Sequence, residues 1–410
     1  MDEFIAYRGG KQLSEEEFRS HMALVTRLEN VGVFLGAGAS KKAGGYLMSD
    51  VWETFANDHS QSKGWLEGRD FAEGNVETLL DQLSIAAEEW NRQGKTRTLK
   101  QLQQHQDNLR RAVLRGGLLS EELISNPTSV MDAESLKDHR NLLARLVGNR
   151  QPGQGSPWIF TTNYDLAVEW AAEAMGLRLI NGFAGLHFRS FAPQNFDLAF
   201  RNIQARGEAR FGIYHTYLVK LHGSLSWLIQ GKGEEPRELA TDGLWPVLDS
   251  FLKGSRKSDW PGFMVFPSAA KYMQTVGFVF GELVRRFTEF LARPHTTLIV
   301  NGYSFGDSHL NRVLSSALNN PTFHLVIYLR DYQGPESESG NAWVRALMRE
   351  SYPQVTIVGS GDRANFERMV ADIPEPALLD DYTERARKFL RAMAGELSKE
   401  LPVVAEEEQP

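Results

Sequence analysis

The sequence predicts an α/β protein: a doubly wound parallel sheet with a large helical insertion and a C-terminal helix. Three observations carry this prediction. A short apolar run at residues 31–35 ends in a glycine turn, which is typical of a buried strand opening into a helix. From residue 158 onward, short apolar runs alternate with segments of helical periodicity, which favours parallel strands joined by helices. Between these two parts, residues 49–149 are helical in periodicity almost throughout.

The composition excludes several classes of protein. The 410 residues include no cysteine, which rules out a disulfide framework, a thiolate zinc site and a cysteine nucleophile. A net charge of −7 argues against a protein built mainly to coat nucleic acid. No apolar run approaches the ~20 residues that span a bilayer, and the first residues lack the pattern of a secretory signal. We therefore expect a cytoplasmic protein with no membrane contact.

The expected elements follow in order along the chain. Ser14 and Glu17 form a capping box near the start of a helix over 13–28, which precedes the first strand. Later strands are expected at 158–160, 177–180, 217–221, 263–266, 296–301, 324–329 and 355–358. Later helices are expected at 164–175, 278–291, 309–318, 342–350, 362–371 and 382–397. The acidic tail after the last helix is expected to be disordered.

This order predicts four parts of the chain. They are an N-terminal helix (1–30), a nucleotide-binding α/β domain (31–48 and 150–375), a helical insertion subdomain (49–149) and a C-terminal helix with the acidic tail (376–410). The insertion is too long for an ordinary connection, so we interpret it as a lid, a subdomain or a packing layer over the sheet. Its basic stretch at 95–115 is expected to be a solvated helix face, and direct contact with nucleic acid is left open.

The glycine turn after the first strand is the first candidate site. Gly36 and Gly38 allow a backbone to approach a diphosphate, and a helix that follows them adds its N–H groups. A dinucleotide fingerprint has a third glycine three residues on, where this chain has Lys41. The turn taken alone is therefore also consistent with a plain tight connection from strand to helix.

Polar residues also follow two later strands of the expected sheet, at 158–160 and 217–221. Thr162, Asn163 and Asp165 come directly after one strand, although Thr162 or Asn163 can also simply cap the next helix. His222 follows the other strand and precedes a glycine. A histidine there can exchange a proton near neutral pH or serve the structure alone.

Small and polar residues also follow two further strands, expected at 296–301 and 355–358. Gly302 and Ser304 come after the most apolar strand, and Asp307 can cap the helix behind them. Gly359 and Ser360 end a further strand. Because the carboxyl ends of parallel strands meet at one edge of the sheet, these residues predict one shared ligand crevice.

This ordered set of motifs resembles the sirtuin family. Gly-Ala-Gly-Ala-Ser, Thr-x-Asn-x-Asp, Leu-His-Gly and Gly-x-Ser follow successive strands in the sirtuin order, over residues 30–365. The resemblance implies a Rossmann-like domain that binds NAD and cleaves its nicotinamide–ribose bond. The chemistry suits these residue types, because loss of nicotinamide leaves an oxocarbenium-like ribose that needs fixed dipoles, a positioned nucleophile and a base.

The resemblance also implies a role for each matching residue. Asn163 would orient the nicotinamide ribose and the attacking water, Asp165 would contact the carboxamide, and Thr162 would contact the cofactor beside them. His222 would be the general base. The residues implied for the diphosphate, the adenosine ribose and the adenine are Gly36, Ala37, Gly38, Ser40, Gly302, Ser304, Gly359 and Ser360.

Two departures distinguish the chain from sirtuins that deacylate proteins. Those enzymes usually carry a four-cysteine zinc ribbon after the catalytic histidine, where this chain has residues 225–262 and no cysteine. Their Gly-Ile-Pro-Asp-Phe-Arg loop is replaced here by residues 44–49. The zinc-free form, with its insertion and Gly-Tyr-Ser-Phe-Gly-Asp turn, looks more like the sirtuin-like NADases of bacterial anti-phage defence. Within that group it is similar to the subunit encoded beside a HerA-type hexameric ATPase, which implies a homo-oligomer and such an ATPase as partner.

The leading hypothesis is an NAD+ glycohydrolase that depletes NAD as an antiviral effector and is gated by assembly with the ATPase. NAD is then the substrate, and no metal is expected in this chain. Two alternatives stay open. A zinc-independent deacylase or ADP-ribosyltransferase would turn over NAD only with an acyl-lysine peptide or an acceptor protein. A scaffold or sensor subunit would bind NAD or ADP-ribose without consuming it. A Rossmann oxidoreductase ranks last, because the third glycine is missing.

Overall fold

The computed structural model describes residues 4–71, 76–151, 154–200, 214–229, 236–254, 262–264, 273–336 and 341–376. Within these ranges the main sheet has nine strands. In spatial order they are β2 (Lys11–Gln12), β1 (Ile5–Arg8), β14 (Val355–Gly359), β13 (Phe323–Tyr328), β12 (Thr296–Asn301), β3 (Asn30–Leu35), β4 (Trp158–Thr161), β8 (His215–Lys220) and β5 (Arg178–Ile180). The strands from β14 to β5 run parallel, and β1 and β2 pair antiparallel at one edge. The predicted doubly wound α/β class is confirmed.

The strand order reverses beside β3. From β3 the chain adds β4 and β8 on one side, and it then crosses to build β12, β13 and β14 on the other side. In sheets of this type, ligands bind outside the carboxyl ends of the strands at such a reversal point. The reversal lies between β3 and β12, which pair in register from Thr296–Asn30 to Asn301–Leu35.

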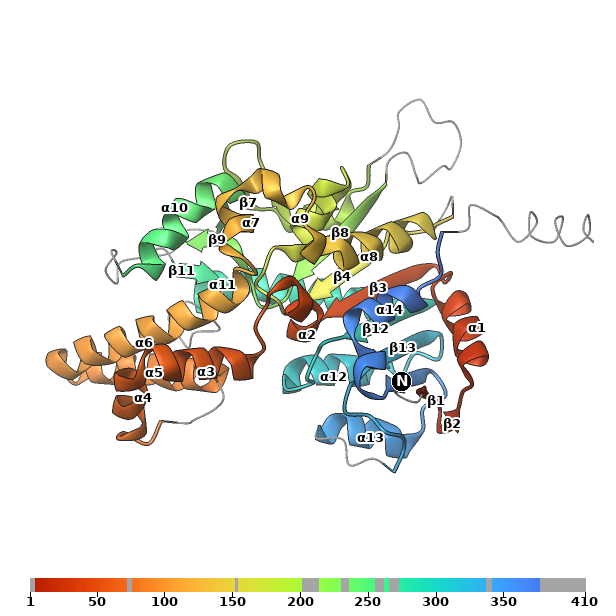
Figure 1. Cartoon of the computed structure of the whole chain (residues 1–410), viewed down its shortest axis with the longest axis horizontal. Coiled ribbons are helices and arrows are strands. Elements are labelled where there is room, and N and C mark those ends of the chain that lie inside the picture. The colour runs from red at the N-terminus through yellow and green to blue at the C-terminus, as the bar shows by residue number, and fades with distance from the viewer. Residues whose placement is uncertain are drawn as a thin grey trace, which may run out of the picture.

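Helices cover both faces of this sheet (Figure 1). One face packs against α1 (Glu15–Val25), α8 (Lys137–Gly148), α9 (Ala167–Ala174) and α14 (Phe366–Asp372). The other face packs against α11 (Met273–Ala292), α12 (Ser308–Ala317) and α13 (Ala342–Glu350). Every residue of β12 is buried, as expected for a central parallel strand with helices on both sides. The predicted capping box of α1 is present, with the Glu17 amide 3.2 Å from Ser14 Oγ and the Ser14 amide 2.8 Å from Glu17 Oε2.

The chain between β3 and β8 includes a largely helical segment with its own apolar core. After the short helix α2 (Ala37–Ser40), its helices are α3 (Met48–Asp58), α4 (Ser60–Glu67), α5 (Val76–Arg92), α6 (Thr96–Gly117) and α7 (Glu121–Ser125). They extend to one side of the sheet (Figure 1). A helix from another part of the chain, α10 (Thr241–Leu252), joins the same core. The sequence did not predict α10.

The basic stretch of α6 is largely occupied by contacts within the protein. Arg110 pairs with Asp107 at 3.4 Å, and Arg115 pairs with Asp58 at 2.8 Å. Arg111 donates from Nε to the carbonyl oxygen of residue 251 at 3.0 Å. Three basic side chains of this stretch are therefore engaged within the protein, so it is only in part the solvated helix face that the sequence predicts.

A second, antiparallel sheet stands beside the main one. Its strands, in spatial order, are β11 (Gly262–Met264), β9 (Ser224–Ile229), β10 (Arg237–Glu238), β7 (Arg189–Phe191) and β6 (Phe183–Ala184). The strand expected at 263–266 therefore belongs to this small sheet and not to the main one. The other four strands were not predicted, because most of them are too short to show an alternating pattern.

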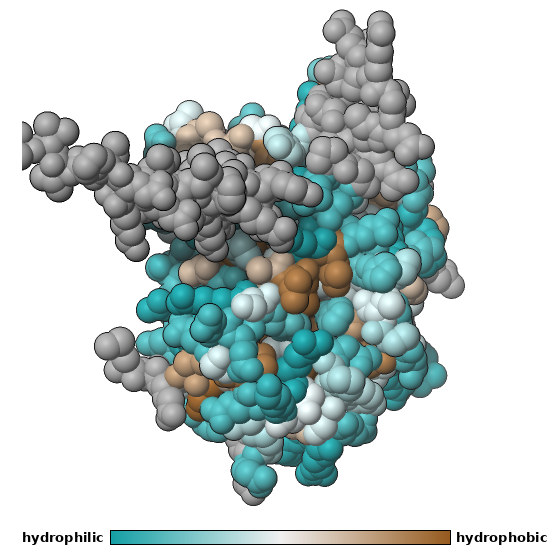
Figure 2. Space-filling model, turned by 90° about the vertical axis from the view of Figure 1, so that its right-hand side faces the viewer, coloured by the Kyte–Doolittle hydropathy of each residue, from teal (hydrophilic) through white to brown (hydrophobic). Residues whose placement is uncertain are grey.

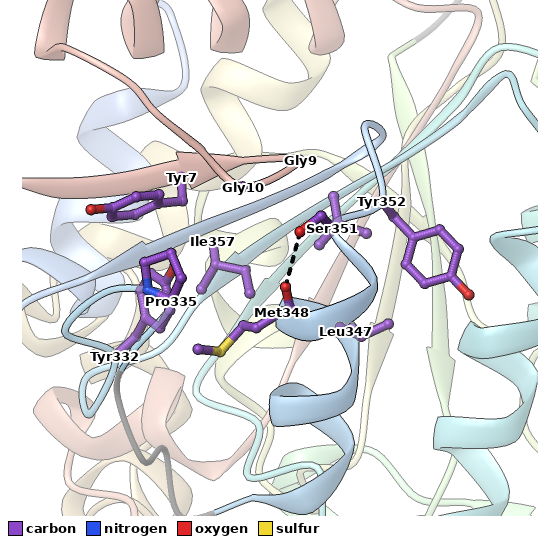
Figure 3. A pocket seen from close by; sticks show the side chains of 11 residues that line it. Tyr7, Gly9, Gly10, Tyr332, Pro335, Leu347, Met348, Ser351, Tyr352 and Ile357 are labelled. Carbon is purple, nitrogen blue, oxygen red and sulfur yellow. Dashed lines mark hydrogen bonds between the residues drawn. The ribbon is translucent and has the colours of Figure 1, made fainter.

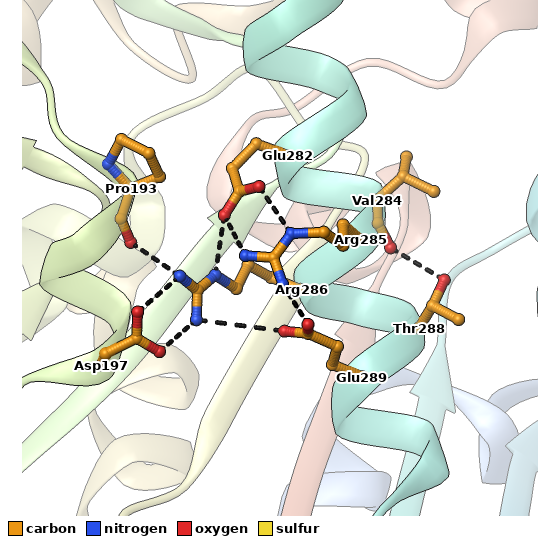
Figure 4. Close-up of polar contacts among 8 residues, drawn as sticks. All are labelled: Pro193, Asp197, Glu282, Val284, Arg285, Arg286, Thr288 and Glu289. Atoms are coloured by element: carbon orange, nitrogen blue, oxygen red, sulfur yellow. Dashed lines mark hydrogen bonds and ion pairs between the residues drawn. The ribbon is translucent and has the colours of Figure 1, made fainter.

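A buried arginine joins the small sheet to α11 (Figure 4). The Arg286 side chain, only 9% exposed, donates from Nη2 to Asp197 Oδ2 at 2.7 Å and from Nε to Glu282 Oε1 at 2.9 Å. Asp197 ends the 3-10 helix η4 (Pro193–Asp197), which follows β7. Since the guanidinium has partners on both elements, the small sheet is fixed against the helix that leads into β12.

The N-terminal segment is more than the helix expected at 1–30. It begins with the hairpin of β1 and β2, and β1 extends the sheet by pairing with β14. The Tyr7 and Tyr332 rings meet edge to face at 6.1 Å beside a crevice of about 20 Å³, which is room for little more than one water molecule (Figure 3). Two larger grooves flank α1. None of these three cavities is lined by a predicted site residue. We therefore define the candidate site by the residues that follow the ends of the strands.

The helix and tail expected beyond residue 381 lie outside the described residues. Of the helices that are described, none combines the length and the apolar character needed to cross a membrane. The face shown in Figure 2 is mostly hydrophilic, with small separate hydrophobic patches.

A histidine between α1 and the sheet makes stability depend on pH. His21 is buried, its Nε2 lies 3.0 Å from Thr356 Oγ1, and burial, with smaller effects of Arg8 and His324, lowers its pKa to about 4. The unfolded chain binds this proton near pH 6.5 and the folded chain only near pH 4. The contribution of neutral His21 to the free energy of unfolding is therefore fully present above pH 6.5 and is lost as the pH falls toward 4.

We predict that replacing His21 with glutamine removes part of this pH dependence. Between pH 7.5 and pH 5 the wild type should lose about 2 kcal/mol more unfolding free energy than His21→Gln. Urea unfolding of both proteins at the two pH values measures the difference. Equal losses would show that His21 is not held neutral in the folded state.

Candidate functional site

The candidate site begins where two backbone turns meet at the strand-order reversal. The turn after β3 and the turn after β12 are joined by two hydrogen bonds. The Gly36 amide donates to the Asn301 carbonyl at 2.9 Å, and the Gly38 amide donates to the Gly302 carbonyl at 3.0 Å. These two amides are therefore engaged within the protein. The sequence resemblance had implied Gly36 and Gly38 as part of a diphosphate cradle.

The closeness of the two turns explains why three of their residues are glycines. A Cβ atom on Gly36 would lie 2.4 Å from the Gly302 carbonyl oxygen, and one on Gly38 would lie 2.7 Å from Gly302 Cα. A Cβ on Gly302 would lie 2.3 Å from the Ala39 amide nitrogen, and Gly302 has a φ of +69°. Glycine at these positions is thus required by the approach of two backbones. This supports the interpretation of the glycine turn as a plain tight connection from strand to helix.

Asn163 ties the end of β4 to the same glycine turn. Its side-chain amide donates to the Gly36 carbonyl at 3.0 Å and to Ser40 Oγ at 2.9 Å, and the side chain is buried. Its backbone amide donates to Thr161 Oγ1 at 2.9 Å. Three residues predicted to act on one ligand, Gly36, Ser40 and Asn163, are therefore in direct contact. The Thr162 amide adds a bond to the Leu35 carbonyl at 3.2 Å.

Neither Thr162 nor Asn163 caps the next helix, because α9 begins at Ala167 and its N-cap position is Leu166. Asp165 Oδ1 accepts from the Ala167 amide, 3.0 Å away, at the start of α9. The Asp165 side chain is buried, like that of Asn163. The capping role considered for Thr162 or Asn163 is therefore wrong, and Asp165, one residue before the N-cap position, makes the side-chain hydrogen bond to the first residue of α9.

A buried ion pair joins the end of β8 to α9, the helix that follows β4. Lys220, at the end of β8, is 2% exposed; its Nζ lies 2.9 Å from Glu169 Oε1 and also donates to the Asp165 carbonyl. Burial raises the pKa of Glu169, and Lys220 opposes that rise. Burial lowers the pKa of the nearby His139. Because Lys220 bonds to the segment that follows β4, the backbone around Asn163 and the backbone around His222 are held together.

His222 contacts the turn after β12. Its Nε2 lies 3.2 Å from Asp307 Oδ2. Their side chains are 20% and 29% exposed. Three strand intervals separate β8 from β12, about 14 Å at ~4.8 Å each, so this contact spans the ends of β4 and β3. The hydrogen bond from His222 and the amides of Leu310 and His309 lower the pKa of Asp307 to about 2, against the opposing effect of burial.

The other predicted residues lie farther along the same edge. Ser304 is exposed, and its carbonyl accepts from Asn341 Nδ2 at 3.1 Å. Gly359 ends β14, where a Cβ atom would lie 2.0 Å from the Tyr332 carbonyl oxygen. Ser360 is buried with a φ of +71°, and its amide donates to the same carbonyl at 2.9 Å. No hydrogen bond among the described residues joins Gly359 or Ser360 to Asn163 or His222.

The site therefore has a connected centre and a more distant arm. The centre joins the ends of β3, β4, β8 and β12. The arm at β14 is linked to it through Asn301 Nδ2, which donates to the Ala364 carbonyl at 2.9 Å. The site prediction omitted Asp307 and Lys220. Asp307 had been noted only as a helix cap, and nothing in the sequence distinguishes a cap that also holds a histidine.

The arrangement offers fixed dipoles, a histidine with a carboxylate partner and a buried amide at one edge of the sheet. In the part of the chain that is described, no group of three or more histidine, aspartate or glutamate side chains is arranged to hold a metal ion. The strand order and the reversal beside β3 define a Rossmann-like α/β domain.

Comparison with known families supports a more specific assignment of the fold. Residues 157–347 match the family model described as a SIR2-like domain, and this supports a sirtuin-like fold. The match includes Asn163, His222, Gly302 and Ser304, and it begins after the glycine turn of β3. SIR2-like domains are in general NAD-dependent enzymes, so the match is compatible with an activity that uses NAD. No curated protein matches the chain.

We predict that Gly36→Ala destabilises the fold even without any ligand. Gly36 has a φ of −104°, which alanine adopts easily, so the cost comes from its collision with Gly302. Overpacking of this kind costs about 1–3 kcal/mol, and urea unfolding measures it. Gly306→Ala in the β12 turn is the matched control. Its Cβ would meet Ser304 Oγ at an ordinary 3.5 Å. Equal stability of the two variants would show that the turns do not pack as described.

Proposed function

We propose that the chain is an NAD+ glycohydrolase, which converts NAD+ and water into nicotinamide, ADP-ribose and a proton. The observation that carries the proposal is the contact of Asn163 with Ser40 and Gly36 on the same sheet edge as His222 with its carboxylate partner. The SIR2-like match over both Asn163 and His222 supports it.

The reaction needs little from the protein beyond positioning, dipoles and one base. The C1′–N bond breaks and its electron pair passes to the pyridinium nitrogen, so nicotinamide leaves as a neutral molecule. The oxygen of water bonds to C1′, and its proton passes to His222 and then to solvent. The Asn163 side-chain amide already uses both of its N–H donors on Gly36 and Ser40, so its Oδ1 is the atom that would accept hydrogen bonds from the ribose hydroxyls and the water.

The identity of residues 225–262 bears on the deacylase alternative. Where a deacylase has its zinc ribbon, this chain has β9, β10, β11 and α10, and Leu225, Leu228 and Leu244 of this segment are buried in the core of the helical insertion. Hydrophobic packing therefore organises this region. Because this region is built differently from that of a deacylase, we rank hydrolysis, with water as the acceptor, ahead of transfer to an acyl-lysine.

We also propose the wider role that the sequence resemblance implies. In it the protein is an oligomeric effector of anti-phage defence, and a HerA-type ATPase gates its NAD hydrolysis. Unregulated hydrolysis would exhaust the NAD pool, so gating is expected. The helical insertion, which extends away from the sheet, is the surface we propose for assembly.

We predict that purified protein releases nicotinamide from NAD+, alone or with the ATPase added, and that Asn163→Ala and His222→Ala each lower kcat by at least about 100-fold. Chromatography of nicotinamide and ADP-ribose measures the rate. Ser316→Ala is the control, because Ser316 is an exposed residue of α12 and is not among the predicted site residues. Thermal unfolding checks that each variant is folded. Wild-type rates in both folded variants would overturn the proposed site, and NAD binding without any product would favour the sensor alternative.

A further inference from the structure

Asp307 contacts both the His222 side chain and the first turn of α12. Asp307 uses both of its carboxylate oxygens. Oδ2 lies 3.2 Å from His222 Nε2, while Oδ1 accepts from the amides of His309 at 2.8 Å and Leu310 at 3.2 Å. The second set of bonds makes Asp307 the N-cap of α12. One residue thus holds both a helix terminus and the candidate base.

The chemistry of the carboxylate determines which ring nitrogen carries the proton. The pKa of Asp307 is about 2, so the group is ionised at neutral pH and can only accept hydrogen bonds. A neutral imidazole has one N–H donor and one acceptor nitrogen. Since Nε2 faces an obligatory acceptor, Nε2 carries the hydrogen and Nδ1 is the acceptor.

We propose that Asp307 is a positioning residue that holds His222 in its Nε2–H tautomer, so that Nδ1 receives the proton when water attacks C1′. This inference rests on the proposed NAD hydrolysis. The proton moves from water to Nδ1, and the positive charge on the imidazolium is then balanced by the Asp307 carboxylate through Nε2–H. Asp307 itself stays ionised and touches no reacting atom.

A purely structural role for Asp307 makes a different prediction. If Asp307 serves only as the N-cap, any good capping residue will replace it without effect on His222. Asparagine and serine are both strong N-caps, so Asp307→Asn and Asp307→Ser should each change the stability by less than about 1 kcal/mol. The two variants differ in what they present to Nε2.

The cap makes the asparagine variant the more harmful one. Capping requires an oxygen toward the amides of His309 and Leu310, so in Asp307→Asn the side-chain NH2 takes the place of Oδ2 and faces Nε2. An NH2 group donates, and it therefore favours an Nε2 without hydrogen and an Nδ1 that carries it. Serine presents no such donor to Nε2. The closer mimic of aspartate should thus hold His222 in the wrong tautomer, while serine leaves both tautomers accessible.

The tautomer can be observed directly, without any catalysis. Full-length protein labelled with ¹⁵N-histidine is examined by magic-angle-spinning NMR at pH 8, and the His222 signals are assigned by their loss in His222→Ala. We expect a protonated Nε2 in the wild type, a protonated Nδ1 in Asp307→Asn and a mixture in Asp307→Ser. Steady-state kinetics on NAD+ should show kcat lowered at least about 100-fold in Asp307→Asn and only about tenfold in Asp307→Ser. KM should change little in either variant.

The outcomes separate this inference from the proposed function. An unchanged Nε2–H tautomer in Asp307→Asn, or equal kcat losses in the asparagine and serine variants, would overturn the inference while leaving NAD hydrolysis in place. If the wild type releases no nicotinamide, the proposed function fails. The NMR arm then still decides whether Asp307 sets the tautomer.

Discussion

The rest of the structure depends on the contact between two backbone turns at the strand-order reversal. The Gly36–Gly38 turn and Gly302 come within the range at which no Cβ atom fits, and two amide–carbonyl hydrogen bonds join them. This contact fixes the half of the sheet that contains β4 and β8 against the half that contains β12. Asn163 then bonds to the carbonyl and the serine of the first turn, and Asp307 stands on the second turn within reach of His222.

Most polar groups of the centre serve the structure and the proposed chemistry together. Asp165 accepts a hydrogen bond from the first residue of α9, Asp307 caps α12, and Lys220 holds the backbone after β4 against the end of β8. Buried groups of this kind are tolerated because each has charged or hydrogen-bonding partners. The cost of burial is nevertheless visible in the raised pKa of Glu169 and the lowered pKa of His139. Such a centre is rigid, which suits a reaction that depends on fixed dipoles.

The sequence predicted the parts of the fold that have long, regular patterns. The alternation after residue 158 gave β12, β13, β14 and their helices to within a few residues, because fully buried strands and amphipathic helices have strong periodicities. The β1–β2 hairpin and four of the five strands of the small sheet were missed, since most of these strands have only two to four residues and show no measurable period. Pairing of β1 with β14, across some 350 residues, is likewise a matter of tertiary contact.

The candidate site was predicted in its residues but not in its connections. Asn163, Ser40 and Gly36 were named from separate motifs, and their mutual hydrogen bonds follow only from the neighbouring ends of β3 and β4. Asp307 had a sufficient local explanation as a helix cap, so nothing in the sequence pointed to its second partner, His222, which follows β8. The glycines had been interpreted as room for a diphosphate, whereas the nearest atoms that require them belong to the facing turn.

The most direct test of the account is the fate of NAD+ incubated with the protein in water enriched in ¹⁸O, followed by mass spectrometry of the products. Hydrolysis at C1′ predicts one ADP-ribose, with one ¹⁸O atom, for each nicotinamide released, with no acyl-lysine peptide or acceptor protein present. Intact NAD+ after prolonged incubation, with or without the ATPase, would contradict the central claim. So would an ADP-ribose product that carries another acceptor in place of the labelled oxygen.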